Sequence, residues 1–260
     1  MRERLVSDKS FDDLAVRFRK NIYGTRKGEI RFSILWRYYQ EHLLRDLGAA
    51  PLKVLDAGCG LGQVAHRLLE IGHQVTLCDV SSEMIREAQS EIPEHLHANA
   101  CFIHSSFQDL AAHHAGEFDL VVCHAVLEWI HAPEEAVVRL AELCRPGGIL
   151  SLMFYNRDAL IFRNLIRGNW KKIRSGNLAG EPGGLTPINP IDPAELGLWL
   201  EQAGFDVIDS IGLRTFFDYL PKPMQQEREL VDILELEYRY STRSPYKDIA
   251  RYIHVRAQKR

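Results

Sequence analysis

The pattern of hydrophobic positions divides the chain near residue 50. Within 8–47, apolar residues recur at helical spacing in two runs, separated by a polar loop with two glycines at 21–28. Beyond residue 52, short apolar runs of strand character alternate with helical segments. The strands predicted from this pattern span 53–56, 74–79, 101–104, 118–123, 149–155, 205–208 and 252–257. The helices predicted between them span 64–71, 136–144, 193–203 and 224–240, with a further one around Met84 and Ala88.

Strands that alternate with helices in this way predict an α/β fold with a mostly parallel sheet. The continuous apolar run at 120–123 is typical of a strand buried on both faces. Residues 206–214 and 251–257 can pair as a terminal hairpin around the helical segment between them. Residues 156–192 differ from the rest, because they are rich in Arg, Lys, Asn and Gly, and they predict a partly helical insertion followed by a loop.

The composition narrows the class of protein only a little. The 260 residues are 46% hydrophobic and 26% charged, which is typical of a globular protein, and the net charge of -3 does not by itself indicate a nucleic-acid binder. The five cysteines contain no CxxC pair, which argues against disulfides or a zinc site and favours a reducing cytosol. Since no stretch approaches the ~18 apolar residues of a membrane span, we expect a cytoplasmic protein without membrane or metal partners.

A glycine-rich loop follows the first predicted strand, in the sequence Asp56-Ala57-Gly58-Cys59-Gly60-Leu61-Gly62. In a doubly wound sheet this is where ligands bind, and glycines let the backbone approach them closely. Asp79 ends the second strand and can accept hydrogen bonds from both ribose hydroxyls of an adenosyl group. The alternatives are a tight turn without a ligand for the loop, and a helix cap or turn residue for Asp79.

The glycine spacing favours S-adenosylmethionine (SAM) over a dinucleotide. NAD requires GxGxxG, which places its pyrophosphate at a helix N-terminus, whereas this chain has GxGxG with Gln63 at the last glycine position. A carboxylate at Asp56 would repel a pyrophosphate but could accept from a methionyl ammonium group. We therefore expect SAM as the cofactor.

Two later loops supply further candidates for the same site. After the third strand, Phe107 and Gln108 can meet the adenine, although an ordinary acidic loop is an equal alternative. After the fourth strand, His124 can contact the methionyl part or the acceptor, while Trp129 is expected in the core.

With these residues in place, the chain resembles the class I SAM-dependent methyltransferases through VLDAGCGLG, LCDVS, FDLVVCHAVLEWI and RPGGILSLMFYN. It is similar in particular to the bacterial tRNA 5-carboxymethoxyuridine methyltransferases. The stretches that carry this closer resemblance are Phe11-Asp12-Asp13, 21–25, 124–129, 152–156 and 251–255. The resemblance implies a Rossmann-like fold with a seven-stranded sheet, mostly parallel, with a terminal antiparallel strand. The expected single domain, 1–260, comprises an N-terminal helical cover (1–50), a cofactor-binding core (51–155), a basic insertion after strand five (156–192) and a C-terminal part (193–260).

The resemblance also implies an activity and a set of cofactor contacts. That family methylates the carboxylate of 5-carboxymethoxyuridine at the tRNA wobble position, which gives the methyl ester. The implied contacts are Arg31, Gly58, Cys59, Asp79, Phe107, Gln108 and His124. Arg31 enters only through the resemblance and would pair with the methionyl carboxylate. Cys59 departs from the family, which often has glycine there, but a contact through the backbone tolerates the change.

The sequence indicates the residues that bind the methyl acceptor less clearly than those that bind the cofactor. A carboxylate with a pKa of about 4 is already ionised near neutral pH, so no catalytic base is required and we name no catalytic residue. An anticodon stem-loop needs phosphate contacts and a place to stack a base. The candidates are Arg157, Lys171 and Lys172 for the backbone, Tyr155, Trp170 and Tyr252 for stacking, and Arg214 or Arg251 for the acceptor carboxylate. Plain surface charge is the alternative for the basic residues.

Three other functions stay open at this point. A carboxyl or O-methyltransferase acting on a small molecule would share the whole cofactor site. A non-catalytic RNA-binding module that holds an adenosine ligand is more remote, because the loop and Asp79 are both intact. An NAD dehydrogenase is the weakest alternative, because the glycine spacing disfavours it.

Overall fold

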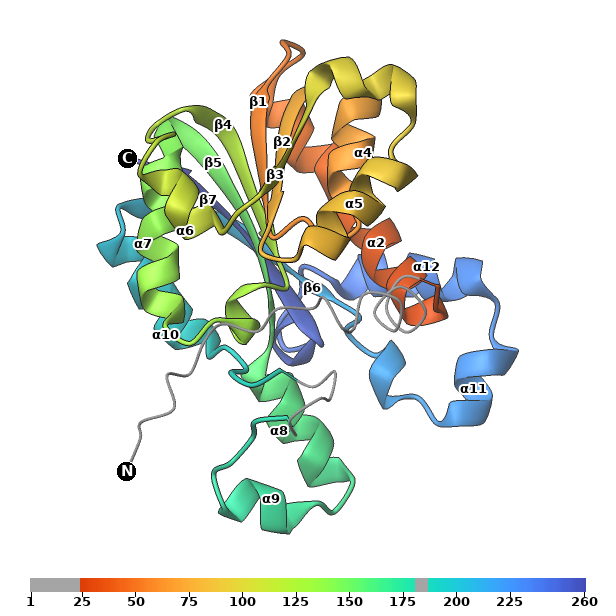
Figure 1. Ribbon diagram of the computed structural model, residues 1–260. Helices are drawn as coiled ribbons and strands as arrows, with labels where there is room; N and C mark the ends of the chain where they lie inside the picture. The colour runs from red at the N-terminus through yellow and green to blue at the C-terminus, as the bar shows by residue number, and fades with distance from the viewer. Residues whose placement is uncertain (1–23, 181–186) are drawn as a thin grey trace.

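A computed structural model describes residues 24–180 and 187–260, and its centre is a seven-stranded sheet (Figure 1). The strand order is β3-β2-β1-β4-β5-β7-β6. The strands are β1 (Lys53–Ala57), β2 (Gln74–Asp79), β3 (Ala100–His104), β4 (Phe118–His124), β5 (Cys144–Tyr155), β6 (Phe205–Leu213) and β7 (Tyr252–Lys259). The prediction of an α/β fold with this sheet is therefore confirmed.

One strand runs against the other six. Strand β7 pairs antiparallel with both β5 and β6, while the remaining neighbours pair in parallel. The predicted terminal hairpin exists as β6 and β7, and β7 inserts between β5 and β6. As a result β5 and β6 end, and β7 begins, at the edge of the sheet where the parallel strands have their carboxyl ends.

Helices cover both faces of the sheet. On one face Leu55 and Val121 pack with α6 (Phe107–Ala111), α7 (Pro133–Leu143) and α10 (Pro193–Gln202). On the other, Val54 and Val122 pack with α2 (Arg26–Tyr38), α4 (Gln63–Glu70) and α12 (Leu230–Tyr240). Figure 1 shows these two groups on opposite sides of the sheet, with α5 (Ser82–Glu91) beside α4. Adjacent residues of one strand thus face opposite layers, which explains the continuous apolar strands.

Local signals explain where several helices begin. The Asp192 side chain accepts from the backbone N–H of Ala194 and Pro193 is the first residue of α10, as predicted. Helix α2 continues through a π-helical turn at Tyr39–Leu43 into α3 (Leu44–Leu47). The first predicted helical run, at the beginning of 8–47, lies outside the described residues.

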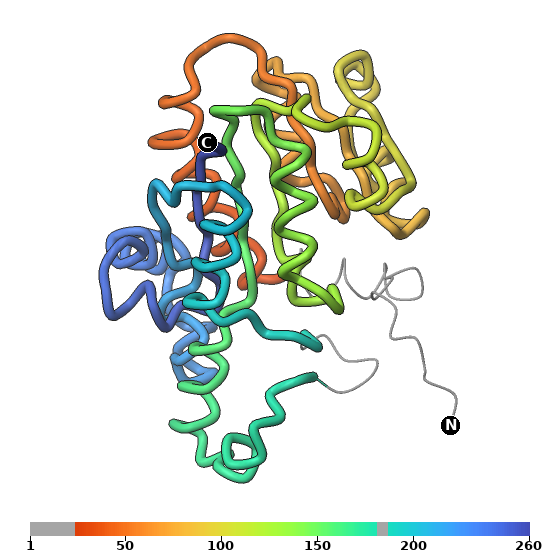
Figure 2. Tube along the Cα trace, turned by 90° about the vertical axis from the view of Figure 1, so that its left-hand side faces the viewer, coloured from red at the N-terminus to blue at the C-terminus, as the bar shows by residue number. Residues whose placement is uncertain are grey.

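The insertion forms α8 (Arg157–Ile166) and α9 (Trp170–Arg174), which project beyond the carboxyl edge of the sheet in both views (Figures 1 and 2). No described helix is long and apolar enough to cross a membrane.

Two predicted elements were wrong. The expected helix 224–240 is two helices, α11 (Lys222–Glu227) and α12, because Arg228 and Glu229 are extended. The guanidinium of Arg26 donates to the carbonyl oxygens of Gln225 and Gln226 at 2.7 and 3.2 Å, so an arginine from α2 binds carbonyls at the end of α11.

The fifth strand begins earlier than expected, at Cys144 rather than 149, and the helix before it ends at Leu143. The Pro-Gly-Gly segment at 146–148 lies within β5, where the register with β4 shifts. A Cβ on Gly148 would lie 3.0 Å from the carbonyl oxygen of Phe118. Glycine therefore allows the two strands to stay close at this irregularity, which a turn signal alone does not reveal.

Candidate active site

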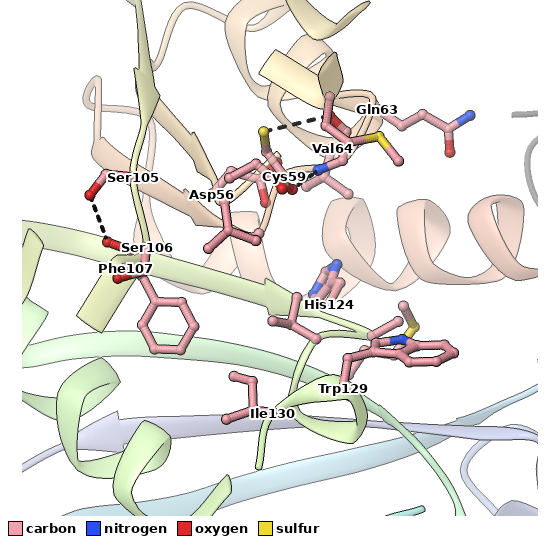
Figure 3. A pocket seen from close by; sticks show the side chains of 18 of the residues that line it. Asp56, Cys59, Gln63, Val64, Ser105, Ser106, Phe107, His124, Trp129 and Ile130 are labelled. Atoms are coloured by element: carbon pink, nitrogen blue, oxygen red, sulfur yellow. Dashed lines mark hydrogen bonds between the residues drawn. The ribbon is translucent and has the colours of Figure 1, made fainter. Parts of the chain in front are cut away.

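A pocket opens at the carboxyl ends of β1 to β4, between the sheet and α2 (Figure 3). All nine candidates for cofactor binding line it: Arg31, Asp56, Gly58, Cys59, Gly60, Asp79, Phe107, Gln108 and His124. They come from α2 and from the carboxyl ends of four different strands and the loops that follow them, so only the assembled sheet brings them together.

The glycine loop forms one wall of the pocket. Gly58 has φ +73°, and a Cβ there would lie 2.5 Å from Cγ2 of Val126. The N–H of Gly60 donates to Oδ2 of Asp79 at 3.0 Å, and the N–H of Ser81 donates to Oδ1 at 2.9 Å. Asp79 is therefore both a turn residue and part of the pocket wall. Its role in the turn is thus compatible with a contact to the ribose of a bound cofactor. A side chain at position 58 would collide with Val126, so the loop can pack against Val126 only with glycine there.

Asp56 is a buried carboxyl group in that wall, only 4% exposed. Its pKa is raised to about 7, mainly by burial and also by the charge of Asp79, while a hydrogen bond from the backbone of Ala65 opposes the shift. A cationic group in the pocket would stabilise the ionised form. Burial also raises the pKa of the neighbouring Cys59 thiol well above its ordinary value, so this side chain is neutral.

His124 belongs to a buried network of neutral polar groups behind the pocket. Its Nε2 lies 2.9 Å from Oγ of Ser151, which also lies 2.8 Å from Nε2 of His254 and 2.5 Å from the hydroxyl of Tyr39. Burial, followed by the proximity of His254 and Arg31, lowers the pKa of His124 well below its usual value. Its Nδ1 is buried and has no hydrogen-bond partner within the described ranges. A neutral imidazole is thus held at the pocket wall.

Aromatic and apolar side chains form the opposite wall. In Figure 3 the rings of Phe107 and Trp129 lie on one side of the pocket, with Ile130 between them, and Asp56 and Cys59 lie on the other. Trp129 is 7% exposed, so it is part of the core, as expected, and also lines the pocket. The sequence reasoning missed the apolar lining by Phe32, Leu35, Met84 and Met153. Helical or strand periodicity shows only that such residues are buried, and does not distinguish a pocket wall from a packed core.

The eight acceptor candidates lie in three places, and as far as the structure describes the chain they are all outside the pocket itself. Tyr155, Arg214, Arg251 and Tyr252 gather beside it, at the ends of β5 and β6 and the start of β7. Arg157 instead forms an ion pair with Asp192. Trp170, Lys171 and Lys172 lie on the projecting helix α9, where Trp170 is 57% exposed.

Nothing among the described residues forms a group of His, Cys, Asp or Glu that could hold a metal ion. The sheet order, the glycine loop at the end of β1 and Asp79 at the end of β2 together define a Rossmann-like fold of the class I methyltransferase type.

Comparisons with known proteins agree with this class. A family model described as "Methyltransferase domain" matches residues 30–210. The tRNA 5-carboxymethoxyuridine methyltransferase of Escherichia coli K12 is 44% identical over 255 residues, which cover 98% of this chain and 97% of that one. A ubiquinone biosynthesis O-methyltransferase of Xanthomonas axonopodis pv. citri is 31% identical over 199 residues, which cover 76% of this chain and 78% of that one.

Among solved structures, magnesium protoporphyrin IX methyltransferase from Synechocystis PCC 6803 with bound SAH has a TM-score of 0.64 at 19% identity, with 96% of each chain covered. The chain belongs to the methyltransferase family, in the branch that contains the bacterial tRNA 5-carboxymethoxyuridine methyltransferases.

Proposed function

We propose that this enzyme transfers a methyl group from SAM to the carboxylate of 5-carboxymethoxyuridine at the wobble position of tRNA, forming the methyl ester. The observation that carries the proposal is the 44% identity to the Escherichia coli enzyme of that name, sustained over nearly the full length of both chains. The ubiquinone biosynthesis enzymes share less, at 31% identity over 76% of this chain.

The residues of the pocket fit SAM group by group. Asp79 would accept from the ribose hydroxyls, and Phe107 and Gln108 would meet the adenine. Arg31 would pair with the methionyl carboxylate, and the buried carboxyl of Asp56 would accept from the ammonium. Gly58, Cys59 and Gly60 would contribute backbone contacts, and His124 lies beside them.

The chain contributes positioning rather than proton transfer. When bound, SAM supplies a methyl group on a positively charged sulfur, and its transfer to an ionised carboxylate requires no base. The neutral state of His124 is compatible with this, because nothing at the site has to remove a proton. The apolar wall of Phe107, Trp129 and Ile130 excludes water, which leaves the acceptor oxygen less solvated and better aligned.

The partner on this proposal is the anticodon stem-loop of tRNA. Helices α8 and α9 carry basic residues beyond the same edge of the sheet as the pocket, which supports a contact with the RNA backbone there.

The test is transfer of labelled methyl groups from SAM to tRNA that carries the carboxymethoxy group. We expect incorporation that mild alkali removes, because an ester hydrolyses where an ether does not. Asp79→Ala should weaken SAM binding by about 10- to 100-fold, since it removes hydrogen bonds to a charged group. Label that enters only small carboxylic acids would reject the proposal in favour of a small-molecule methyltransferase. Label in the tRNA that resists alkali would reject the methyl ester in favour of another tRNA methylation.

A further inference from the structure

A cluster of charged side chains lies beside the pocket, and the mechanism above does not use it. Strand β5 ends at Tyr155, which pairs in register with Tyr252 at the start of β7, and β6 ends at Leu213 opposite the same Tyr252. Because β7 runs against its neighbours, Arg251 before it and Arg214 after β6 come to one edge of the sheet. We use the name cationic cluster for Lys27, Arg163, Arg214 and Arg251 together with Asp218.

Asp218 is at the centre of the cationic cluster and is 3% exposed. Nε of Arg214 donates to its Oδ2 at 2.7 Å, and Nε of Arg251 lies 3.6 Å from the same oxygen. Nζ of Lys27 lies 3.2 Å from Oδ1. The side chain of Lys27 is 41% exposed, whereas that of Arg251 is 5% exposed, so the cluster opens to solvent at Lys27.

Arg163, from α8, adds a fourth positive charge. It lies within electrostatic range of Arg251 and Asp218, and its Nε is buried without a hydrogen-bond partner among the described residues. Among the described residues, the cationic cluster therefore contains one carboxylate, Asp218, and four cations. A buried guanidinium nitrogen without a partner is costly unless a ligand provides an acceptor.

The electrostatics of the individual groups reflect this excess of positive charge. Burial lowers the pKa of Lys27, and the positive charges of Arg214 and Arg163 oppose the attraction of Asp218. Burial lowers the pKa of Arg163, and Arg251 lowers it further. Burial alone would raise the pKa of Asp218, but Arg214 and Arg251 hold it well below its usual value. An additional anion would relieve the repulsion among the cations.

One aromatic ring separates the cationic cluster from the cofactor pocket. The ring centre of Tyr252 lies 5.3 Å from Cζ of Arg31, which lines the pocket, and 5.6 Å from Cζ of Arg214. The ring of Tyr155 stands edge-on to that of Tyr252, with 5.5 Å between their centres. An acceptor whose charged group reached the cluster would therefore lie next to the pocket.

We infer that the cationic cluster is the anion site of the acceptor, in which Lys27 and Arg163 receive the carboxylate of the modified uridine while Asp218 holds Arg214 and Arg251 in place. The inference rests on the proposed function for the identity of the acceptor. The site would bind an oxyanion, which either the carboxylate of the modified uridine or a phosphate of the anticodon loop could supply. The carboxylate is favoured because it is the charged group that distinguishes the modified uridine from uridine, and because the cluster borders the pocket in which that carboxylate is methylated.

The experiment compares three synthetic anticodon stem-loops that differ only at the wobble base: carboxymethoxyuridine, its methyl ester, and uridine. Their dissociation constants are measured with S-adenosylhomocysteine present, so that no reaction occurs. The variants are Lys27→Gln and Arg163→Gln, which leave the pairing of Arg214 with Asp218 intact. Arg260→Gln is the matched control, because Arg260 is exposed at the opposite end of β7.

We expect the wild-type protein to bind the carboxylate RNA more tightly than the other two. Each variant should weaken binding of that RNA by about 10- to 100-fold, the usual effect of losing a hydrogen bond to a charged group, and should hardly affect the ester and uridine RNAs. Equal weakening for all three would overturn the assignment in favour of a phosphate. Unchanged binding in both variants, or the same loss in Arg260→Gln, would overturn the anion site altogether.

A different result is expected if the proposed function itself is wrong. If the acceptor is not this tRNA, the wild-type protein transfers no label to the carboxymethoxy RNA. If only the anion site is wrong, the wild-type protein transfers label normally and the variants bind the carboxylate RNA as it does. Affinity for S-adenosylhomocysteine should stay unchanged in both variants, which shows that each is folded and that the cofactor pocket is intact.

Discussion

Two polar clusters lie at the carboxyl edge of the sheet, and they differ in charge: one is neutral and the other carries excess positive charge. The first joins Tyr39, Ser151, His124 and His254 through a single hydroxyl, with all four groups neutral. The second, the cationic cluster, buries Asp218 among cations that outnumber it in the described part of the chain.

The difference shows which polar groups serve the fold and which are kept for a ligand. A neutral network costs less to bury than unpaired charge, even though Nδ1 of His124 and of His254 has no partner among the described residues, so it can hold His124 at the pocket wall. Excess charge is expensive to bury and gains little from packing. Its retention beside the pocket is therefore better explained by binding an anion than by stability.

The largest expected effect comes from removing the central charge of the cationic cluster. Asp218→Asn keeps the shape of the side chain but leaves Arg214 and Arg251 without a counterion, which should cost about 3–5 kcal/mol in the free energy of unfolding. Urea denaturation at neutral pH measures it.

Ser151→Ala is the matched change in the neutral network, and it should cost only about 1–3 kcal/mol, since no charge is left unpaired. Equal losses for the two variants would contradict the distinction between the clusters.

A smaller effect is expected from the pH dependence of the neutral network. Burial, followed by the charge of Arg256, lowers the pKa of His254 to about 3 in the folded protein. Below about pH 6.5 the unfolded chain gains a proton there that the folded protein does not bind, so stability falls by about 1.4 kcal/mol per pH unit and is unaffected above that pH.

His254→Gln removes this contribution. Between about pH 7 and about pH 5 the wild-type protein should lose about 2 kcal/mol more than the variant does. Denaturation curves at the two pH values provide the measurement, and the contributions of groups that do not interact with His254 cancel in the difference. Equal losses of stability in the wild-type protein and in the variant would mean that His254 becomes protonated in the folded protein.

The smallest effect is expected on the projecting helix α9. Lys171→Gln with Lys172→Gln should weaken binding of the three stem-loops equally, by a few-fold, and reduce the slope of log affinity against log salt by about 2. Filter binding over a salt series measures both, and the stability should not change. A loss confined to the carboxylate RNA would instead assign these lysines to acceptor recognition and break the contrast with the cationic cluster.

The fold and the cofactor loop were predictable because their signals are local. Alternating apolar runs identify buried strands, and the loop from Asp56 to Gly62 directly follows the first of them. Asp79 is close to that loop in sequence and ends the neighbouring strand, so topology alone places it at the pocket. The break at Arg228 was not predictable in this way, because the group that binds the end of α11 is Arg26, about 200 residues away in the chain.

The sequence by itself thus determined the α/β architecture and the elements that carry the cofactor pocket, since hydrophobic period and glycine spacing act over a few residues. The tertiary structure alone decided that Lys27, Arg214 and Arg251 pair with one carboxylate close to Arg163, while Arg157 pairs with Asp192 and Trp170 remains exposed. Those residues look alike in sequence, as scattered basic or aromatic positions. The physical reason for the difference is that β7 reverses direction and brings distant parts of the chain to one edge of the sheet.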